Sequence, residues 1–173
     1  MKKMLFTLAF TIAAAGFAAE DIRIDLAAKT GLVCNSVSKG VTASPAIWMK
    51  EKQDQRLLIR ATSTPEWKQY SFQFTPKTDG TIDLNIMSNQ KNKDICYDKF
   101  EVKGAVLKNG DFEKMNSKGL PEGWVLNENV LCSEGALSGK YCVRANHDKR
   151  AMQRISVKAG QKVEVSFMAK SAK

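Results

Sequence analysis

The chain has few of the residues on which catalysis and metal binding usually depend. It contains a single histidine, His147, and no Cys-x-x-Cys pair, so a zinc site lacks its usual ligands. No nucleophile motif such as Gly-x-Ser-x-Gly accompanies that histidine. Carboxylates are plentiful, but none stands in a recognisable motif for glycosidases, which hold two carboxyls about 5–10 Å apart across one bond. We therefore expect a protein that is not an enzyme.

No apolar run is long enough to span a membrane comfortably. The longest is Met4–Ala15, which follows Lys2 and Lys3. A membrane anchor is the alternative interpretation, but spanning takes about 20 apolar residues. Small residues at the two positions read by a signal peptidase follow in Gly16-Phe17-Ala18. We expect residues 1–18 to be a cleaved signal peptide and the protein to be secreted, periplasmic or part of the cell envelope.

The basic charge is not concentrated in a stripe. Removing residues 1–18 lowers the formal charge from +9 to +7 and leaves 155 residues, enough for one domain over 19–173. Apart from Lys91-Asn92-Lys93 and Lys149-Arg150, the cations are scattered. Nucleic-acid binding usually needs a concentrated basic surface with stacking aromatics, so no nucleic-acid partner is expected. An acidic glycan or a charged envelope surface stays open as a partner.

Four cysteines in an exported chain favour two disulfides over thiol chemistry or metal binding. Three pairings are possible, and the sequence does not select among them. Cys132 and Cys142 flank a glycine-bearing turn between two apolar stretches. This position favours a cross-strand bridge between these two, which would leave Cys34 to pair with Cys96, while the other two pairings stay open.

Apolar and polar residues alternate with a period of two along much of the chain. This pattern predicts strands with one packed face, in an all-β protein. No long stretch has a convincing helical period, although residues 44–54 are expected to be short helical or irregular chain around Trp48. The clearest alternating segments are Ile22–Leu26, Tyr70–Phe74, Ile82–Ile86 and Val163–Phe167.

Turn residues separate the predicted strands. Thr78-Asp79-Gly80 and Lys158-Ala159-Gly160 each predict a hairpin between the strands on either side. Many short strands with regular turns are typical of a sandwich of two antiparallel sheets.

Residues 107–124 read Leu-Lys-Asn-Gly-Asp-Phe-Glu and then Gly-Leu-Pro-Glu-Gly-Trp. This segment resembles the opening of galactose-binding-like carbohydrate-binding modules, the jelly rolls of families 4, 9, 16 and 22. In that group an opening strand leads, a strand like Gln153–Val157 comes later, and the next one ends much as Ser166–Ser171 does. The resemblance implies a jelly-roll β-sandwich that binds carbohydrate.

The order of the resembling parts is reversed. Residues 65–75 are similar to the late tryptophan-bearing strand of such modules, and 97–102 to their closing strand. Residues 19–104 thus resemble a C-terminal half and 107–173 an N-terminal half. Circular permutation is the favoured interpretation, because new ends at a surface loop are tolerated. The alternatives are half-modules completed by strand exchange between chains, giving a homo-oligomer, and a fragment of a tandem array.

The resemblance also implies a structural calcium ion between the opening and closing segments. The residues at the matching positions are Asp98, Asp111 and Glu113, with nearby backbone carbonyls. Such hard oxygen ligands suit Ca²⁺. The alternative is that they are ordinary solvated carboxylates at strand ends. No other cofactor is expected.

The tryptophans and the polar strand faces supply the candidate ligand contacts. Trp48 lies in the least regular segment, where an aromatic ring can pack against a sugar. Trp67 and Trp124 match core or rim positions, so packing is their expected role. Long polar side chains on a sheet face can hydrogen-bond sugar hydroxyls. The candidates of this kind are Arg144, Asn146 and Gln153.

Together these features predict a non-catalytic exported module that binds a polysaccharide or glycoconjugate. The same architecture also serves adhesion and assembly. The alternative function is therefore a structural or self-assembling protein of the cell envelope, and an enzyme is the third and weakest of the possibilities.

Overall fold

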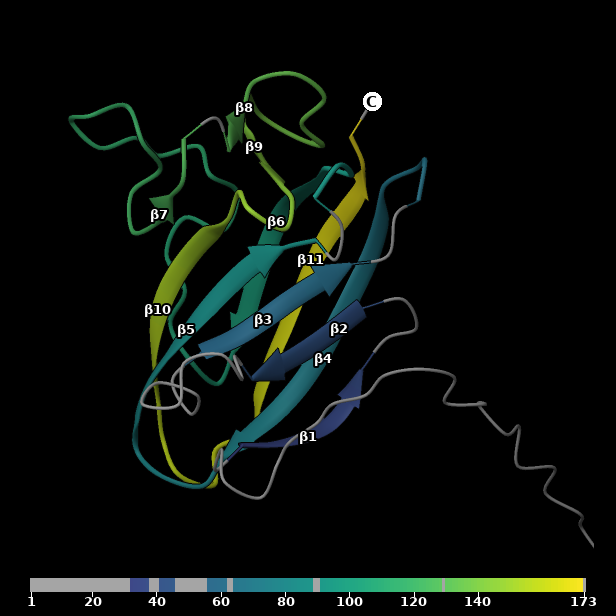
Figure 1. Cartoon of the computed structure of the whole chain (residues 1–173). Helices are drawn as coiled ribbons and strands as arrows, with labels where there is room; N and C mark the ends of the chain where they lie inside the picture. Colours follow the sequence, from purple (N-terminus) through teal and green to yellow (C-terminus); the bar gives the residue numbers. More distant parts are fainter. Residues whose placement is uncertain are drawn as a thin grey trace, which may run out of the picture.

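A computed structural model describes residues 32–37, 41–45, 56–61, 64–88, 91–128 and 130–172, with the backbone alone for the first two ranges. The described residues form eleven strands in two sheets and contain no helix (Figure 1). In particular, none of these segments is a helix long and apolar enough to cross a membrane. The predicted all-β sandwich is confirmed at this level. The signal peptide, the segment Ile22–Leu26 and Trp48 lie outside the described residues.

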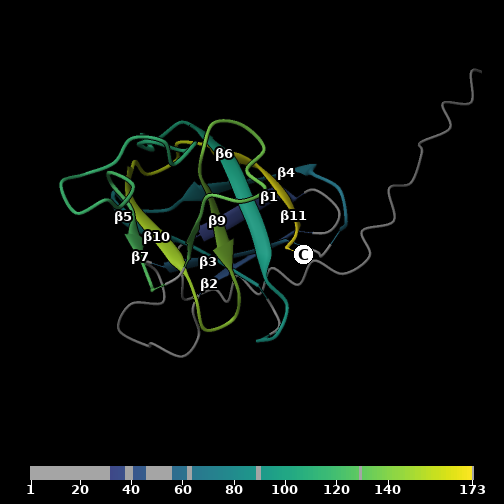
Figure 2. The ribbon, with the colours of Figure 1, turned by 90° about the horizontal axis from the view of Figure 1, so that it is seen from above.

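One sheet has six strands and the other five (Figures 1 and 2). The six-stranded sheet has the order β1 (Leu32–Val37), β4 (Lys68–Pro76), β11 (Val163–Ser171), β6 (Ile95–Lys103), β9 (Cys142–Ala145) and β8 (Leu131–Cys132). The five-stranded sheet has the order β2 (Val41–Pro45), β3 (Arg56–Ala61), β5 (Gly80–Met87), β10 (Ala151–Val157) and β7 (Val125–Leu126).

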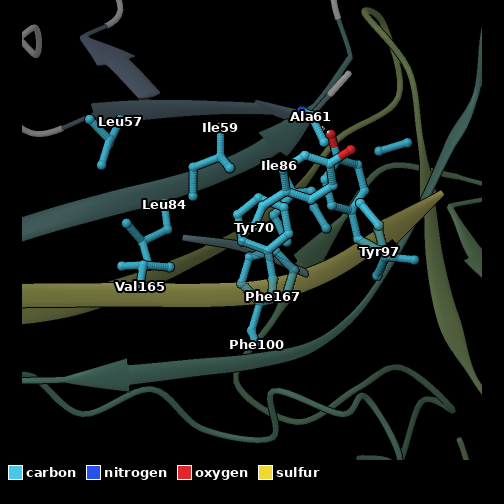
Figure 3. Packing of buried hydrophobic residues seen from close by; sticks show 14 of the residues in the cluster. Leu57, Ile59, Ala61, Tyr70, Leu84, Ile86, Tyr97, Phe100, Val165 and Phe167 are labelled. Atoms are coloured by element: carbon cyan, nitrogen blue, oxygen red, sulfur yellow. Dashed lines mark hydrogen bonds between the residues drawn. The ribbon is translucent and has the colours of Figure 1, made fainter. Parts of the chain in front are cut away.

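The predicted alternation is confirmed in the strands that supply the core. In β4 and β11 every second side chain is buried, and these side chains face the other sheet. Figure 3 shows the centre of this core, where Phe167 of β11 lies between aromatic rings from neighbouring strands. Its ring centroid is 4.8 Å from that of Phe100 and 5.8 Å from that of Tyr70. Full burial of such a side chain stabilises the fold by about 1.5–3 kcal/mol.

The five-stranded sheet is not purely antiparallel, which corrects the prediction of two antiparallel sheets. β3 and β5 pair in parallel, with Leu57 opposite Leu84 and Ile59 opposite Ile86. The chain leaves β3, crosses to β4 in the other sheet and returns to β5. Because each connection reverses the direction of the chain, β3 and β5 run the same way and pair in parallel.

The two predicted hairpins are also corrected. β4 and β5 belong to different sheets, and so do β10 and β11, so both turns are arches that cross the sandwich. The two arches bind one another. Asp79 Oδ1 accepts a hydrogen bond from Ala159 N (2.8 Å), and Gly160 N donates to Pro76 O (2.8 Å). The turn residues predicted where the chain reverses, but not which sheet it enters.

The two halves that resemble parts of a module interleave within one chain. β11 from the second half lies between β4 and β6 from the first, and β10 pairs with β5. The halves therefore complete both sheets without a second copy. The galactose-binding-like jelly-roll assignment and the permuted order stay predictions.

The segment matching the opening strand of the modules is not a strand here. Between β6 and β7 the described chain makes only an isolated bridge between Met115 and Pro121. Asn109 and Phe112 have φ values of 52° and 63°, which turn the backbone. Phe112 is nevertheless fully buried, with its ring 4.8 Å from Trp124. The motif thus supplies a core aromatic through an irregular loop.

Candidate functional site

A row of side chains crosses the outer face of the six-stranded sheet near the end of β11. Lys170 of β11 lies opposite Cys96 of β6, and Cys96 lies opposite Arg144 of β9. Residues paired across strands share a face of the sheet. The neighbours Ala169 and Tyr97 are fully buried in the core, so this row faces outward.

These side chains line a pocket of about 170 Å³, which we call the outer-face pocket. The loop of residues 133–141, between β8 and β9, contributes one of its walls. A Cβ atom at Gly135 of this loop would lie 3.5 Å from Lys170 Nζ, so the loop approaches the lysine closely. The full lining is Cys96, Cys132, Glu134, Gly135, Arg144, Lys170 and Ala172.

Asp94, just before β6, organises the polar end of the pocket. Its Oδ2 accepts a hydrogen bond from Arg144 Nε and its Oδ1 accepts one from Asn146 Nδ2, both at 2.8 Å. Asn146 is 7% exposed, and its Oδ1 accepts from the backbone N–H groups of Asp148 and Lys149. Of these two predicted ligand residues, Arg144 therefore lines the pocket, while Asn146 holds Asp94 and the following loop in place.

Trp67 extends this surface beyond the pocket. It lies just before β4 and is half-buried, and Lys170 Nζ is 5.0 Å from the centroid of its ring. This cation–π contact connects the aromatic ring to the pocket lining through one side chain. We predicted only packing for Trp67. Its half-exposed position depends on β4 lying beside β11, which the alternation within either strand does not reveal.

Cys96, Cys132 and Cys142 are free thiols, so neither predicted bridge is present. Cys132 and Cys142 do lie directly opposite one another across β8 and β9, as their spacing predicted. The pairing of Cys34 with Cys96 does not fit the strand register. Cys34 lies opposite Phe74, whose partner on β11 is Val163, whereas Cys96 lies opposite Lys170. At the usual strand rise the two cysteine Cα atoms are about 20 Å apart along the sheet, and bridging requires less than about 7 Å.

The thiols have distinct electrostatic surroundings. A hydrogen bond between Cys142 and Cys96, with the cations of Lys170 and Arg144 nearby, lowers the pKa of Cys96 to about 7. The same hydrogen bond and burial raise the pKa of Cys142. Both Cys132 Sγ and Cys142 Sγ donate to Glu134 O, at 3.3 and 3.9 Å.

Two of the predicted calcium ligands lie beneath the 133–141 loop. Asp98 is buried, and its Oδ2 accepts from Leu137 N (2.9 Å) and Ser138 N (3.3 Å). Glu113 Oε1 accepts from Lys140 N (2.9 Å) and Tyr141 N (2.7 Å). Burial raises the pKa of Asp98, whereas the hydrogen bonds that its carboxylate accepts from the backbone N–H groups of Lys99, Leu137 and Ser138 lower it. The two carboxylates therefore hold the loop by accepting N–H groups.

These contacts do not form a ready cation site, because three of the four oxygens of Asp98 and Glu113 face N–H donors. Asp111, the third predicted ligand, is exposed, and Glu113 N lies 3.5 Å from its Oδ1. No group of three His, Cys, Asp or Glu side chains in the described ranges is placed to hold a metal ion. The calcium site stays a prediction.

Gln153 lies on the inward face of β10, not on a polar outer face. It is 4% exposed, and its side-chain amide both accepts from Lys108 N (2.6 Å) and donates to Lys108 O (2.8 Å). It thereby attaches the irregular segment before Asn109 to the five-stranded sheet. Trp124 packs in the core as expected and donates from Nε1 to Asn109 O (2.9 Å).

The sequence analysis did not single out Lys170, Asp94 or Glu134. Nothing in the alternation distinguishes Lys170 from other polar residues on β11, and the two acidic residues lie outside the long strands. Comparisons with protein-family models, with curated proteins and with solved structures return no match to this chain. The function is therefore argued from the residues of the site.

Proposed function

We propose that this protein is a non-catalytic carbohydrate-binding module whose ligand occupies the outer-face pocket. The supporting observation is that Arg144 and Lys170 line one pocket, with Trp67 in contact with Lys170. A sugar presents hydroxyls to polar groups and an apolar ring face to an aromatic side chain. This surface offers both kinds of partner.

The size and charge of the pocket limit which ligands can bind there. Its 170 Å³ is below the about 300–1,000 Å³ typical of sites for larger ligands, so it suits a terminal sugar and not an internal stretch of polysaccharide. Arg144 is already paired with Asp94, at 2.8 Å. Lys170 is then the cation that would meet a carboxylate on the ligand. We propose a glycan ending in an acidic sugar.

Export and a structural calcium ion belong to the same proposal. The N-terminal signal-like segment supports export. The nearness of Asp98 and Glu113 beneath one loop supports calcium only in part, because their oxygens accept N–H groups. Calcium binding would require the 133–141 loop to turn some of these N–H groups away.

A glycan array followed by calorimetric titration tests the proposal. We expect binding of glycans with acidic termini, and a loss of at least about tenfold in affinity for Lys170→Ala, because a charge-assisted hydrogen bond contributes roughly 1.5–3 kcal/mol. Trp67→Ala should weaken binding as well. Lys118→Ala, at an exposed loop lysine that does not line the pocket, is the charge-matched control and should bind as the wild type does.

The result is decided by two comparisons. If no glycan binds at millimolar concentration, the carbohydrate proposal fails. If a glycan binds with equal affinity to the wild type and Lys170→Ala, but is lost in Trp48→Ala, the ligand is carbohydrate but its site is not the outer-face pocket.

A further inference from the structure

Three of the four cysteines lie together on the outer face of the six-stranded sheet. Cys96 and Cys132 line the outer-face pocket, and Cys142 contacts both of the others. They come from three adjacent strands, β6, β9 and β8, which lie side by side near the end of β11 (Figure 1). Sugar binding makes no use of these thiols.

Cys132 and Cys142 are positioned to form a disulfide with little movement. Arg144 N donates to Val130 O (2.7 Å), so Val130 and Arg144 are a hydrogen-bonded pair of the antiparallel ladder. Such pairs recur at every second residue, and Cys132 and Cys142 are therefore a hydrogen-bonded pair as well. Such pairs have Cα atoms about 5.5 Å apart, within the 4.4–6.8 Å range of disulfides. Both thiols also donate to the same carbonyl oxygen, Glu134 O.

On its other side Cys142 lies next to Cys96, close enough for the two thiols to shift each other's pKa. Cys96 lies opposite Arg144, so Cys142 is its diagonal neighbour on β9. Diagonal neighbours have Cα atoms about 7–8 Å apart, at the upper limit for a disulfide. A bridge between Cys96 and Cys142 therefore needs a small shift of the short strand β9.

Cys96 and Cys132 do not reach one another directly. β9 lies between their strands, and two strand spacings separate them by about 10 Å. Cys142 is consequently the shared partner, and only one of its two possible disulfides can exist at a time.

We propose that Cys132, Cys142 and Cys96 form a thiol–disulfide exchange site that reacts with a small anionic disulfide entering the outer-face pocket. Cys132, the most accessible of the three, attacks one sulfur of the incoming disulfide, whose S–S bond breaks and releases one thiolate. Cys142 then attacks Cys132 Sγ and releases the second thiolate. The protein has lost two electrons and two protons, and the incoming disulfide has become two thiols.

The third thiol extends this chemistry within the protein. Cys96 attacks Cys142 Sγ, forms a new bond and displaces Cys132 as the leaving thiolate. This exchange moves the disulfide from the β8–β9 pair to the β9–β6 pair without any net oxidation. Because the in-register pair needs less movement, the Cys132–Cys142 bridge is the favoured product.

The charge of the pocket selects the incoming reagent. Lys170 and Arg144 line the pocket beside Cys96 and Cys132, and Asp94 and Glu134 are the nearby acids. Lys170 has no acidic partner among the ion pairs of the described residues. A disulfide bearing carboxylates is therefore favoured over one bearing ammonium groups.

The test uses the full chain carrying Cys34→Ser, reacted in its reduced form with 3,3′-dithiodipropionate, followed by peptide mapping under non-reducing conditions. We expect one intramolecular disulfide per chain, mainly between Cys132 and Cys142. Cys96→Ser should keep that bridge. Cys132→Ser should give a slower Cys96–Cys142 bridge, and Cys142→Ser should give only mixed disulfides at Cys96 and Cys132.

Because Cys142 is buried, Cys142→Ala serves as a second variant, and circular dichroism confirms that each variant is folded. A Cys96–Cys132 bridge in either folded Cys142 variant would overturn the shared-partner arrangement. Reaction of the Cys34→Ser protein to three mixed disulfides with no internal bridge would overturn the exchange site altogether.

The charge selectivity is measured by comparing 3,3′-dithiodipropionate with cystamine, a cationic disulfide of similar size. We expect the ratio of the anionic to the cationic reaction rate to be several-fold higher for the folded protein than for the unfolded chain in denaturant. Lys170→Met should remove this preference and Lys118→Met should keep it. Equal relative rates in the protein that carries only Cys34→Ser would overturn the anionic assignment. No glycan is present, so these results stand apart from the test of sugar binding.

Discussion

At the scale of single residues, Tyr97 joins the two sheets. Its side chain starts on β6, in the six-stranded sheet, and its hydroxyl donates to Met87 O of β5 and accepts from Ala61 N of β3. Tyr97 is fully buried, and this burial raises the pKa of its phenol. A single hydroxyl thus satisfies two backbone groups of the five-stranded sheet at the ends of a parallel strand pair.

Tyr97→Phe should therefore lower the free energy of unfolding by about 1–3 kcal/mol, because it leaves the Ala61 N–H and the Met87 C=O without this partner. Urea unfolding monitored by tryptophan fluorescence measures the change. The matched control is Tyr141→Phe, at a half-buried tyrosine on the loop beside β9, which should change stability by much less. Equal effects of the two substitutions would show that the hydroxyl bridge contributes little.

At the scale of elements, the 133–141 loop is held in place from beneath by two carboxylates. Asp98 binds its centre and Glu113 binds its end, so β6 and the irregular segment before β7 position one wall of the outer-face pocket. Gly139 of this loop has φ of 66°, and a Cβ there would lie 2.5 Å from the Glu113 carboxyl carbon. A larger residue would have to displace the carboxylate that accepts from Lys140 N and Tyr141 N.

We expect Gly139→Ala to cost about 2–4 kcal/mol, from the strained φ together with the lost loop hydrogen bonds. Gly160→Ala is the matched control, because Gly160 has a similar φ of 71° but a Cβ atom there would meet nothing within 4 Å. It should cost only about 1–2 kcal/mol. Chemical unfolding compares the two variants, and limited proteolysis should cut the 133–141 loop faster in Gly139→Ala alone. Similar stability and similar proteolysis of both variants would contradict the carboxylate anchoring.

At the scale of the whole molecule, the two halves of the sequence are inseparable. β11 and β10 from the second half each lie beside strands of the first half, so neither sheet is complete without both. The two arches also join the halves, because Asp79 of the first half binds Ala159 of the second at one end of the sandwich. The chain therefore satisfies its own strand pairing.

Light scattering after gel filtration should accordingly give the mass of one chain at all accessible concentrations. Strand exchange would leave each copy with half of its core exposed until a partner arrived, which costs apolar burial that the intramolecular pairing already provides. A dimer that grows with concentration would instead favour the assembly function. Measuring the reduced and oxidised protein separately distinguishes strand exchange from bridges between cysteines of different chains.

The sequence by itself determined that Tyr70–Phe74, Ile82–Ile86 and Val163–Phe167 are strands, because their apolar and polar residues alternate with a period of two. It also determined the nearness of Cys132 and Cys142, since both flank one turn. Only the tertiary structure decided which sheet each strand joins, as the arches at Asp79 and Ala159 show. The outer-face pocket depends on this arrangement of strands in the sheets. Lys170, Cys96 and Arg144 come from strands far apart in the sequence and meet only through long-range register, which local patterns do not encode.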